Sequence, residues 1–250
     1  CALPILNRSA NYTAIGNLSI TPHISLTGRM VVVGKLWLRD GEMYHDGGLV
    51  MAPGYTIERT PDAAFSVPTV SFPKGGPYRL VHCKGLSVAT TMAGVEASGA
   101  LSVWVSYNPG GVEVRRRTLV SDSLILRSGE FRNPVDSFKL ADGAWVRRSD
   151  AGSCSGRFGG GQYSLQYVSG RMDAGDELQG RVNHVISQMS DTLRFGFPAE
   201  IQGDLSIESG VLLVQGDSLK CRTVFNLSVL QAPAKLRLNG GLENTGVFVS

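Results

Sequence analysis

The chain has 250 residues, of which 42% are hydrophobic and only 18% charged, with a formal net charge of +3. This length suffices for one large domain or two domains of roughly 100–150 residues each. The charge surplus is too small to indicate nucleic acid as the main partner. No apolar run is long enough for a transmembrane helix, so the sequence predicts no membrane insertion.

Short runs of alternating hydrophobic and polar residues, separated by turn residues, follow one another along the chain. Residues 31–38 predict a buried strand, with Trp37 in the core. Residues 101–107 alternate, and Asn-Pro-Gly-Gly at 108–111 leads into 112–115, which predicts a β-hairpin. Only 173–189 shows near-helical spacing, which predicts one or two helical turns.

Later runs repeat the strand pattern at 163–167, 193–197, 205–214, 223–230, 236–238 and at the carboxyl end. Many short strands joined by glycine and proline turns predict an all-β fold, a β-sandwich of immunoglobulin-like or jelly-roll-like kind. Hydrophobicity falls between Ser128 and Gly161, which indicates two β domains, 1–150 and 151–250, with a single sandwich as the alternative. No internal repeat of 20–50 residues is visible.

The cysteines are Cys1, Cys83, Cys154 and Cys221. The chain does not begin with Met, and we interpret residue 1 as the end left by signal cleavage, with a cloning boundary as the alternative. An even cysteine count in an exported chain favours two structural disulfides. We prefer Cys1–Cys83 with Cys154–Cys221, because this pairing closes each half of the chain by itself. No cysteine or histidine spacing is typical of a metal site.

No catalytic motif is evident, so we expect a protein that is not an enzyme and needs no cofactor. Asp204, Glu208 and Asp217 flank turns, where Asp is favoured for its hydrogen bonds to the backbone. A secreted carbohydrate-binding module or a glycan-active β-sandwich enzyme, with two carboxyls in a cleft, is one alternative.

Aromatic and basic side chains supply the candidate ligand-binding residues. Trp104 faces opposite to the neighbouring apolar row, and a flat aromatic ring can stack on a sugar. Tyr107 on the same strand is a second candidate. Arg115 and Arg117 belong to one of two basic clusters, which protects an edge strand or binds an acidic glycan.

Four Asn-x-Ser/Thr sequons occur, at Asn7, Asn11, Asn17 and Asn226. They allow a further alternative, a viral or eukaryotic glycosylated ectodomain.

Two segments resemble subunits of bacterial chaperone–usher fimbriae: the alternating run Leu18–Leu26 and the carboxyl end, Leu236–Ser250. The resemblance implies an immunoglobulin-like fold that lacks one strand, which a periplasmic chaperone or a neighbouring subunit supplies by strand addition. It also implies a lectin-like receptor-binding domain at 1–150 and a pilin-like domain at 151–250. The expected function is therefore a secreted surface adhesin that passes through the periplasm and binds a host glycan or protein receptor.

Overall fold

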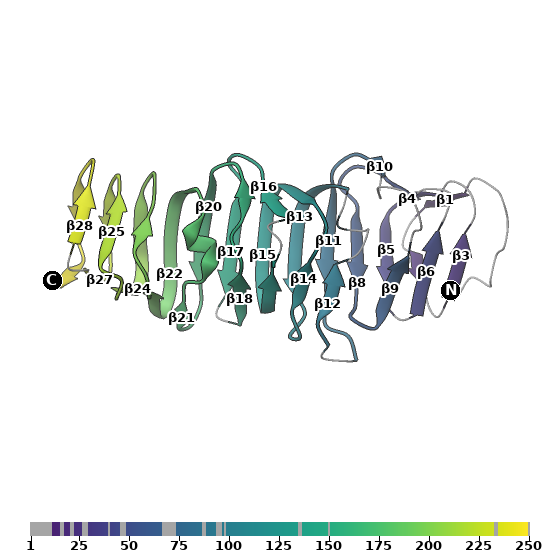
Figure 1. Ribbon diagram of the computed structural model, residues 1–250, viewed down its shortest axis with the longest axis horizontal. Coiled ribbons are helices and arrows are strands. Elements are labelled where there is room, and N and C mark those ends of the chain that lie inside the picture. Colours follow the sequence, from purple (N-terminus) through teal and green to yellow (C-terminus); the bar gives the residue numbers. More distant parts are fainter. Residues whose placement is uncertain are drawn as a thin grey trace.

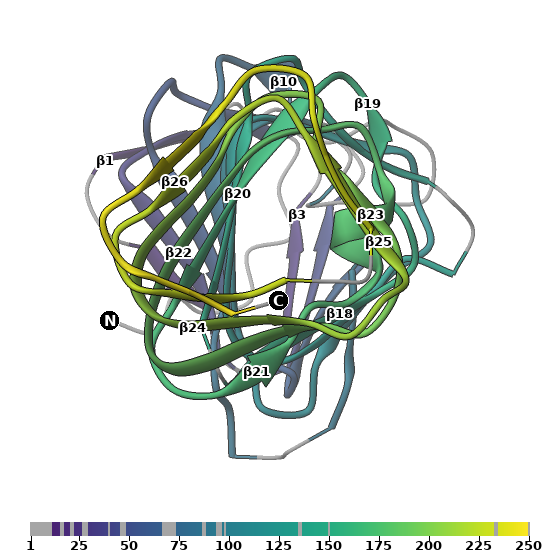
Figure 2. The same ribbon diagram turned by 90° about the vertical axis from the view of Figure 1, so that its left-hand side faces the viewer.

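The computed structural model describes the chain from Tyr12 to Val249 apart from short stretches, which are 16–17, 21–22, 27–29, 40, 46–48, 67–73, 87–88, 94–96, 98, 135–136, 150 and 233–234. The described residues form a parallel β-solenoid, in which the chain winds around one axis and each turn stacks on the one before. Figure 1 shows the turns side by side along a rod, and Figure 2 looks down its axis from the carboxyl end. Each turn, or rung, contributes strands to up to three sheets.

The first sheet is the longest and is continuous. Its strands, each paired in parallel with the next, are β2 (Leu18–Ile20), β5 (Lys35–Leu38), β8 (Thr56–Arg59), β11 (Tyr78–His82), β13 (Ala100–Tyr107), β15 (Thr118–Arg132), β17 (Trp145–Ser149), β20 (Tyr163–Val168), β22 (Val182–Phe195), β24 (Leu205–Val214), β26 (Val224–Asn226) and β29 (Leu242–Asn244). The strands on either side of the predicted domain boundary, β17 and β20, pair with each other in this sheet.

The second sheet precedes the first in each rung and is interrupted. Its strands are β1 (Tyr12–Ile15), β4 (Met30–Val33), β7 (Leu49–Met51), β10 (Lys74–Gly75), the start of β15, β16 (Phe138–Leu140), β19 (Gly159–Gly160), β23 (Ala199–Glu200), β25 (Ser218–Cys221) and β28 (Lys235–Leu238). Between β19 and β23 its place is taken by η2, a 3₁₀ turn at Asp176–Gln179.

The third sheet follows the first in each rung. Its strands are β3 (His23–Leu26), β6 (Gly41–His45), β9 (Ala63–Ser66), β12 (Thr91–Ala93), β14 (Val112–Val114), the end of β15, β18 (Gly152–Ser155), β21 (Met172–Asp173), the ends of β22 and β24, β27 (Val229–Gln231) and β30 (Val247–Val249).

The core is a set of ladders in which one inward position is repeated from rung to rung. The longest ladder carries one residue from each of the ten consecutive strands β5 to β26 of the first sheet, each at most 1% exposed: Leu36, Ile57, Leu80, Trp104, Leu124, Val146, Leu165, Val185, Leu205 and Val224. Large apolar side chains at every step, aliphatic except for Trp104, fill the rod, which explains the alternating apolar runs along the sequence.

The β-sandwich prediction, including its immunoglobulin-like and jelly-roll-like forms, is wrong, because the strands are parallel and coil around a single axis. Alternation with period two is the same in parallel and antiparallel strands, so it could not distinguish the two. Strand addition to an incomplete immunoglobulin-like fold therefore has no basis in this structure.

The predicted hairpin at 101–115 is wrong for the same reason. Strand β13 pairs with β11 and β15, not with β14. Asn108 makes a corner instead, because its buried side-chain amide donates to Ala89 O, Thr91 Oγ1 and Gly111 O.

A repeat is present, although none was visible in the sequence. In the longest ladder, paired residues on neighbouring rungs are between 19 positions apart, as for Leu205 and Val224, and 24 positions apart, as for Leu80 and Trp104. Because the spacing varies and only the apolar character recurs, the sequence shows no fixed period. The helical turn predicted within 173–189 is limited to η2, and from Val182 the chain is strand β22.

Candidate functional sites

One edge of the first sheet carries an outward-facing column of residues along the rod. The last inward positions of seven consecutive strands pair in register and are Leu38, Arg59, His82, Ser106, Leu126, Arg148 and Tyr167. The residue after each of them points outward, because side chains alternate along a strand. These residues, which we call the corner column, are Arg39, Thr60, Cys83, Tyr107, Arg127, Ser149 and Val168.

The first hollow along this column, the Trp37 hollow, has a volume of about 530 Å³. Its walls are Trp37, Leu38, Arg39, Glu58, Thr60, Asp62, Cys83, Lys84, Gly85, Leu86 and Tyr107. The walls mix aromatic and aliphatic surface with a few charged groups, which is the usual make-up of a small-ligand site.

Trp37 organises the charges at the mouth of this hollow. Lys35 Nζ lies 4.4 Å and Arg39 Cζ 4.3 Å from the centre of the indole ring, which is cation–π geometry. Lys35 also forms an ion pair with Glu58 on the next rung. Partial burial raises the pKa of Glu58, but its hydrogen bond and ion pair with Lys35 outweigh this and lower the pKa below its usual value. The Glu58 carboxylate is therefore ionised at neutral pH.

The segment that carries Cys83 and Leu86 forms another wall and is held by Asp62. The Leu86 amide donates to Asp62 Oδ2 over 2.7 Å. A Cβ at Gly85 would lie 2.1 Å from the same oxygen, so only glycine allows this approach. Burial, with the Glu58 charge as a smaller cause, raises the pKa of Cys83 to about 11. Its thiol is therefore protonated at neutral pH.

The second hollow along the column, the Arg147 hollow, has a volume of about 400 Å³. Its walls are Tyr107, Ile125, Leu126, Arg127, Arg147, Ser149, Ala151, Val168 and Ser169. Ser149 Oγ donates to Arg127 O over 2.8 Å and ties two neighbouring rungs together at the corner.

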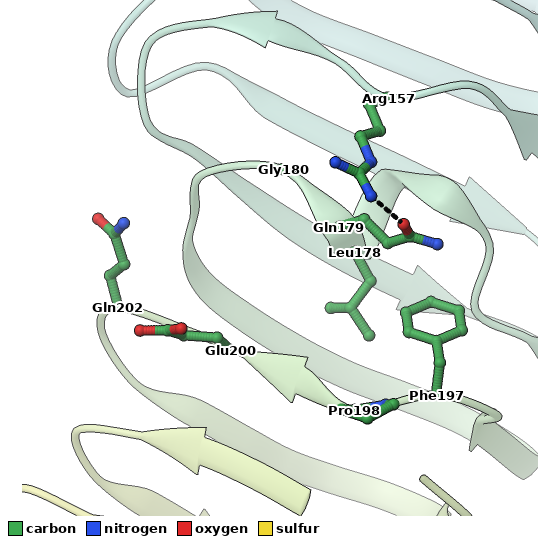
Figure 3. Close-up of a pocket in the computed structure, with 8 residues that line it drawn as sticks. All are labelled: Arg157, Leu178, Gln179, Gly180, Phe197, Pro198, Glu200 and Gln202. Atoms are coloured by element: carbon green, nitrogen blue, oxygen red, sulfur yellow. Dashed lines mark hydrogen bonds between the residues drawn. The ribbon is translucent and has the colours of Figure 1, made fainter.

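A third hollow, of about 470 Å³, opens where η2 replaces a strand of the second sheet (Figure 3). Its polar groups are already paired with one another or with their neighbours. Arg157 Nη2 donates to Gln179 Oε1 over 3.0 Å, and Glu200 Oε1 accepts from Lys220 Nζ over 2.7 Å. Because its polar groups have protein partners, this hollow is a weaker candidate for a ligand than the two along the corner column.

A charged pair inside the rod joins η2 to strand β17. Arg148 and Glu177, 6% and 0% exposed, form an ion pair. Glu177 Oε1 also accepts from Tyr167 Oη over 3.1 Å and from the Gly175 amide over 3.0 Å. Burial lowers the pKa of Arg148, but the Glu177 charge outweighs this and raises it. Because both side chains of the pair are buried, we assign this network to the stability of the fold.

Trp104, the leading candidate from the sequence, is 0% exposed and offers no surface to a ligand. Its Nε1 donates to His82 Nδ1 over 3.0 Å, and its ring packs edge-on against Phe131. The pairing of β13 with β15 shifts between Leu101 and Val103. Such an irregularity moves the following side chains to the other face of the sheet. The alternation of apolar and polar residues in the sequence could not show it.

The other candidates are exposed. Tyr107, 50% exposed, lines both hollows of the corner column. Arg115 and Arg117 are exposed beyond the end of β14, and Arg115 pairs with Glu113. Neither arginine lines a hollow described above.

The disulfide prediction is wrong for the described cysteines. Cys83, Cys154 and Cys221 are free thiols. They belong to the corner column, to β18 in the third sheet and to β25 in the second, on rungs far apart. Cys1 lies outside the described residues, and the cysteines no longer support an oxidising compartment.

The sequon at Asn226 lies in the interior. Asn226 is 0% exposed, and its amide donates to Asn244 Oδ1 over 2.7 Å, so no glycan fits there. Asn7, Asn11 and Asn17 lie outside the described residues.

Sequence reasoning missed most of the corner column. Trp37 was expected in the core, yet it lines a hollow with Arg39 and Lys84, and Arg127 and Arg147 line the next hollow. No common local signal marks these residues, because Arg39 directly follows strand β5 whereas Trp37, Arg127 and Arg147 lie within strands. Which strands lie side by side had to be known before these residues formed a set.

Comparison with known proteins gives no relative: no family model, no curated protein and no solved structure matches the chain. In the part of the chain that the structure describes, no cluster of three or more His, Cys, Asp or Glu residues is placed to hold a metal ion. No helix among the described residues is long and apolar enough to cross a membrane.

Proposed function

We propose that this protein is a non-enzymatic attachment protein that binds a glycan at the Trp37 hollow. The observation that carries the proposal is the combination, in one hollow, of the aromatic side chains Trp37 and Tyr107 with the charged groups of Arg39, Lys84 and Glu58. Sugars present apolar ring faces and polar edges. Tyrosine and tryptophan suit both, because each has an apolar body and a polar group.

The state of the two most reactive groups supports binding without chemistry. A general acid needs a carboxyl whose pKa is raised towards neutral pH, whereas the pKa of Glu58 is lowered. A nucleophilic cysteine needs a lowered pKa, whereas that of Cys83 is raised to about 11. Glu58 therefore acts as a fixed acceptor that the Lys35 ammonium holds in place.

The test is affinity electrophoresis of the purified protein through gels that each contain one neutral or acidic polysaccharide. We expect at least one polysaccharide to retard the protein, and Tyr107→Ala to weaken that retardation about tenfold or more, as for a truncated aromatic contact at a binding centre. Tyr55→Ala is the matched control, because Tyr55 is also exposed, at 37%, but lines neither hollow.

Two results would overturn the proposal. One is that no polysaccharide retards the protein, and the other is that Tyr55→Ala weakens binding as much as Tyr107→Ala. Incubation of the bound polysaccharide with the protein should also release no new chain ends, and release of chain ends would show that the site is catalytic.

A further inference from the structure

We infer that the ligand is a linear acidic polysaccharide that lies along the corner column and occupies both the Trp37 hollow and the Arg147 hollow. This inference rests on the proposed function and specifies the ligand. Its first support is geometric, because Tyr107 is a wall of both hollows. The two hollows therefore adjoin at Tyr107 along the corner column, and we call the two together the groove.

The length of this groove suits a polymer. It extends from the rung of β5, which carries Trp37, to the rung of β20, which carries Val168, and the intervening strands pair one after another. Six steps between neighbouring strands span roughly 29 Å. A single sugar would fill a small part of such a groove, whereas a chain of several sugars would contact both hollows.

The charge of the groove favours an acidic chain. Arg39, Lys84, Arg127 and Arg147 line it and are exposed. Among the described residues, no carboxylate forms an ion pair with any of these four.

The acidic groups of the groove are already engaged. Glu58 pairs with Lys35, and Asp62 accepts a hydrogen bond from the Leu86 amide. Elsewhere on the rod, Lys220 forms an ion pair with Glu200, and Arg222 forms one with Asp204, in each case one rung away. The groove therefore keeps a surplus of positive charge, and arginine matches the geometry of a carboxylate especially well.

Tyr107 lies where the two hollows meet. Tyr107 is 50% exposed, so a sugar ring of the ligand can stack on it. Acidic groups of the ligand on one side of that ring can then reach Arg39 or Lys84. Those on the other side can reach Arg127 or Arg147. Because each rung repeats the corner position, contacts recur along the ligand at the spacing of the strands.

The test measures the affinity of the full chain for alginate oligosaccharides, which are linear uronic-acid chains, in a series of increasing length, with dextran as the neutral comparison. We expect affinity to rise with length until a chain spans both hollows, to fall with added salt, and to be absent for dextran. The double variant Arg127→Ala/Arg147→Ala should lose about tenfold or more in affinity for long chains, the cost of a lost charge-assisted hydrogen bond. The same variant should bind short chains as the unchanged protein does.

The matched control removes the same charge from another face. Lys235 and Arg237 line a hollow of the second sheet at β28, and Lys235→Ala/Arg237→Ala should bind both short and long chains normally. An equal loss in this control would show general attraction to a basic protein and overturn the inference. So would equally tight binding of single-stranded DNA, or affinity independent of chain length.

These outcomes separate the two proposals. In one outcome, short chains or a neutral polysaccharide bind, Tyr107→Ala abolishes that binding, and neither the length of the ligand nor Arg127→Ala/Arg147→Ala changes the affinity. The proposed function then stands, and the inference of an extended acidic ligand is wrong. If no saccharide binds, both proposals are wrong.

Discussion

The middle of the rod and its last described rung have similar residues at equivalent positions, yet only the middle is closed. In the first sheet, Leu205 and Val224 are 0% exposed, whereas Leu242, the next step of the same ladder, is 42% exposed. In the third sheet, Leu230 is 0% exposed and Phe248 on the next rung 36%. The residue type is similar, so burial in this fold comes from having a rung on both sides.

The same comparison explains where a charge can be buried. Arg148 and Glu177 lie among rungs that are stacked on both sides, and the interior supplies Glu177 with a tyrosine and a backbone amide as further donors. In the last described rung Glu243 is exposed. The four predictions below test this difference between the closed middle and the open rung, beginning with the largest effect.

The largest effect should come from breaking the interior ion pair. Glu177→Ala leaves the buried Arg148 guanidinium without a counter-charge and should lower the free energy of unfolding by about 3–5 kcal/mol, measured by urea denaturation. Glu200→Ala is the control, because it removes the exposed partner of Lys220 and should cost about 1 kcal/mol or less. Equal losses for the two variants would mean that the interior is not closed around Arg148.

The second prediction truncates the same ladder at a closed and at an open step. Leu205→Ala should lower the free energy of unfolding by about 2–5 kcal/mol, because it leaves a cavity between two rungs. Leu242→Ala should cost less than about 1 kcal/mol, because nearly half of that side chain is already in water. A loss at Leu242 as large as at Leu205 would show that something covers the last rung.

The third prediction concerns acid and the pairs on the outer surface of the middle rungs. The hydrogen bond and charge of Arg222 lower the pKa of Asp204 below 3.8, and hydrogen bonds from Ser155 and Arg132 lower that of Glu130 below 4.5. A carboxyl with a lowered pKa in the folded state stabilises the fold above its unfolded pKa. That contribution to stability is lost as the pH falls through the pKa that the carboxyl has in the folded state.

The free energy of unfolding, measured by urea denaturation from neutral pH to pH 3, should therefore be steady down to about pH 5 and then fall. Asp204→Asn should reduce the fall, whereas Glu243→Gln on the open rung should leave it unchanged. A stability that is flat down to pH 3, or that falls equally in all variants, would contradict the assignment of these pairs.

The smallest effect is a difference in thiol reactivity. Burial raises the pKa of Cys83 and of Cys221 to about 11 and that of Cys154 well above its usual value. Iodoacetamide should therefore label the native protein slowly at about pH 8, Cys83 first because it is the least buried, and label all three quickly after unfolding. A mass two protons lower for any peptide pair of these cysteines in the non-reduced protein would contradict the free thiols.

The sequence was sufficient to predict several local features. The apolar alternation along 163–167 and 205–214 places strands where the structure has β20 and β24, and the low charge and many glycines indicate a turn-rich β protein. Tyr107 was a candidate ligand-binding residue in the sequence, and in the structure it is exposed and lines both hollows of the corner column. These features depend on neighbours a few residues apart, which is the range over which strand and turn preferences act.

The tertiary structure alone decided which strands lie side by side, and with that the site. Each strand pairs with one about a rung away in sequence, and the rung length varies, so neither the parallel stacking nor the register follows from local preference. A single shift between Leu101 and Val103 turned Trp104 inward, although the alternation had placed it outside. Arg39, Lys84, Tyr107 and Arg127 belong to four different rungs, and only the stacking of those rungs brings them to one groove, because backbone hydrogen bonds between rungs set their spacing.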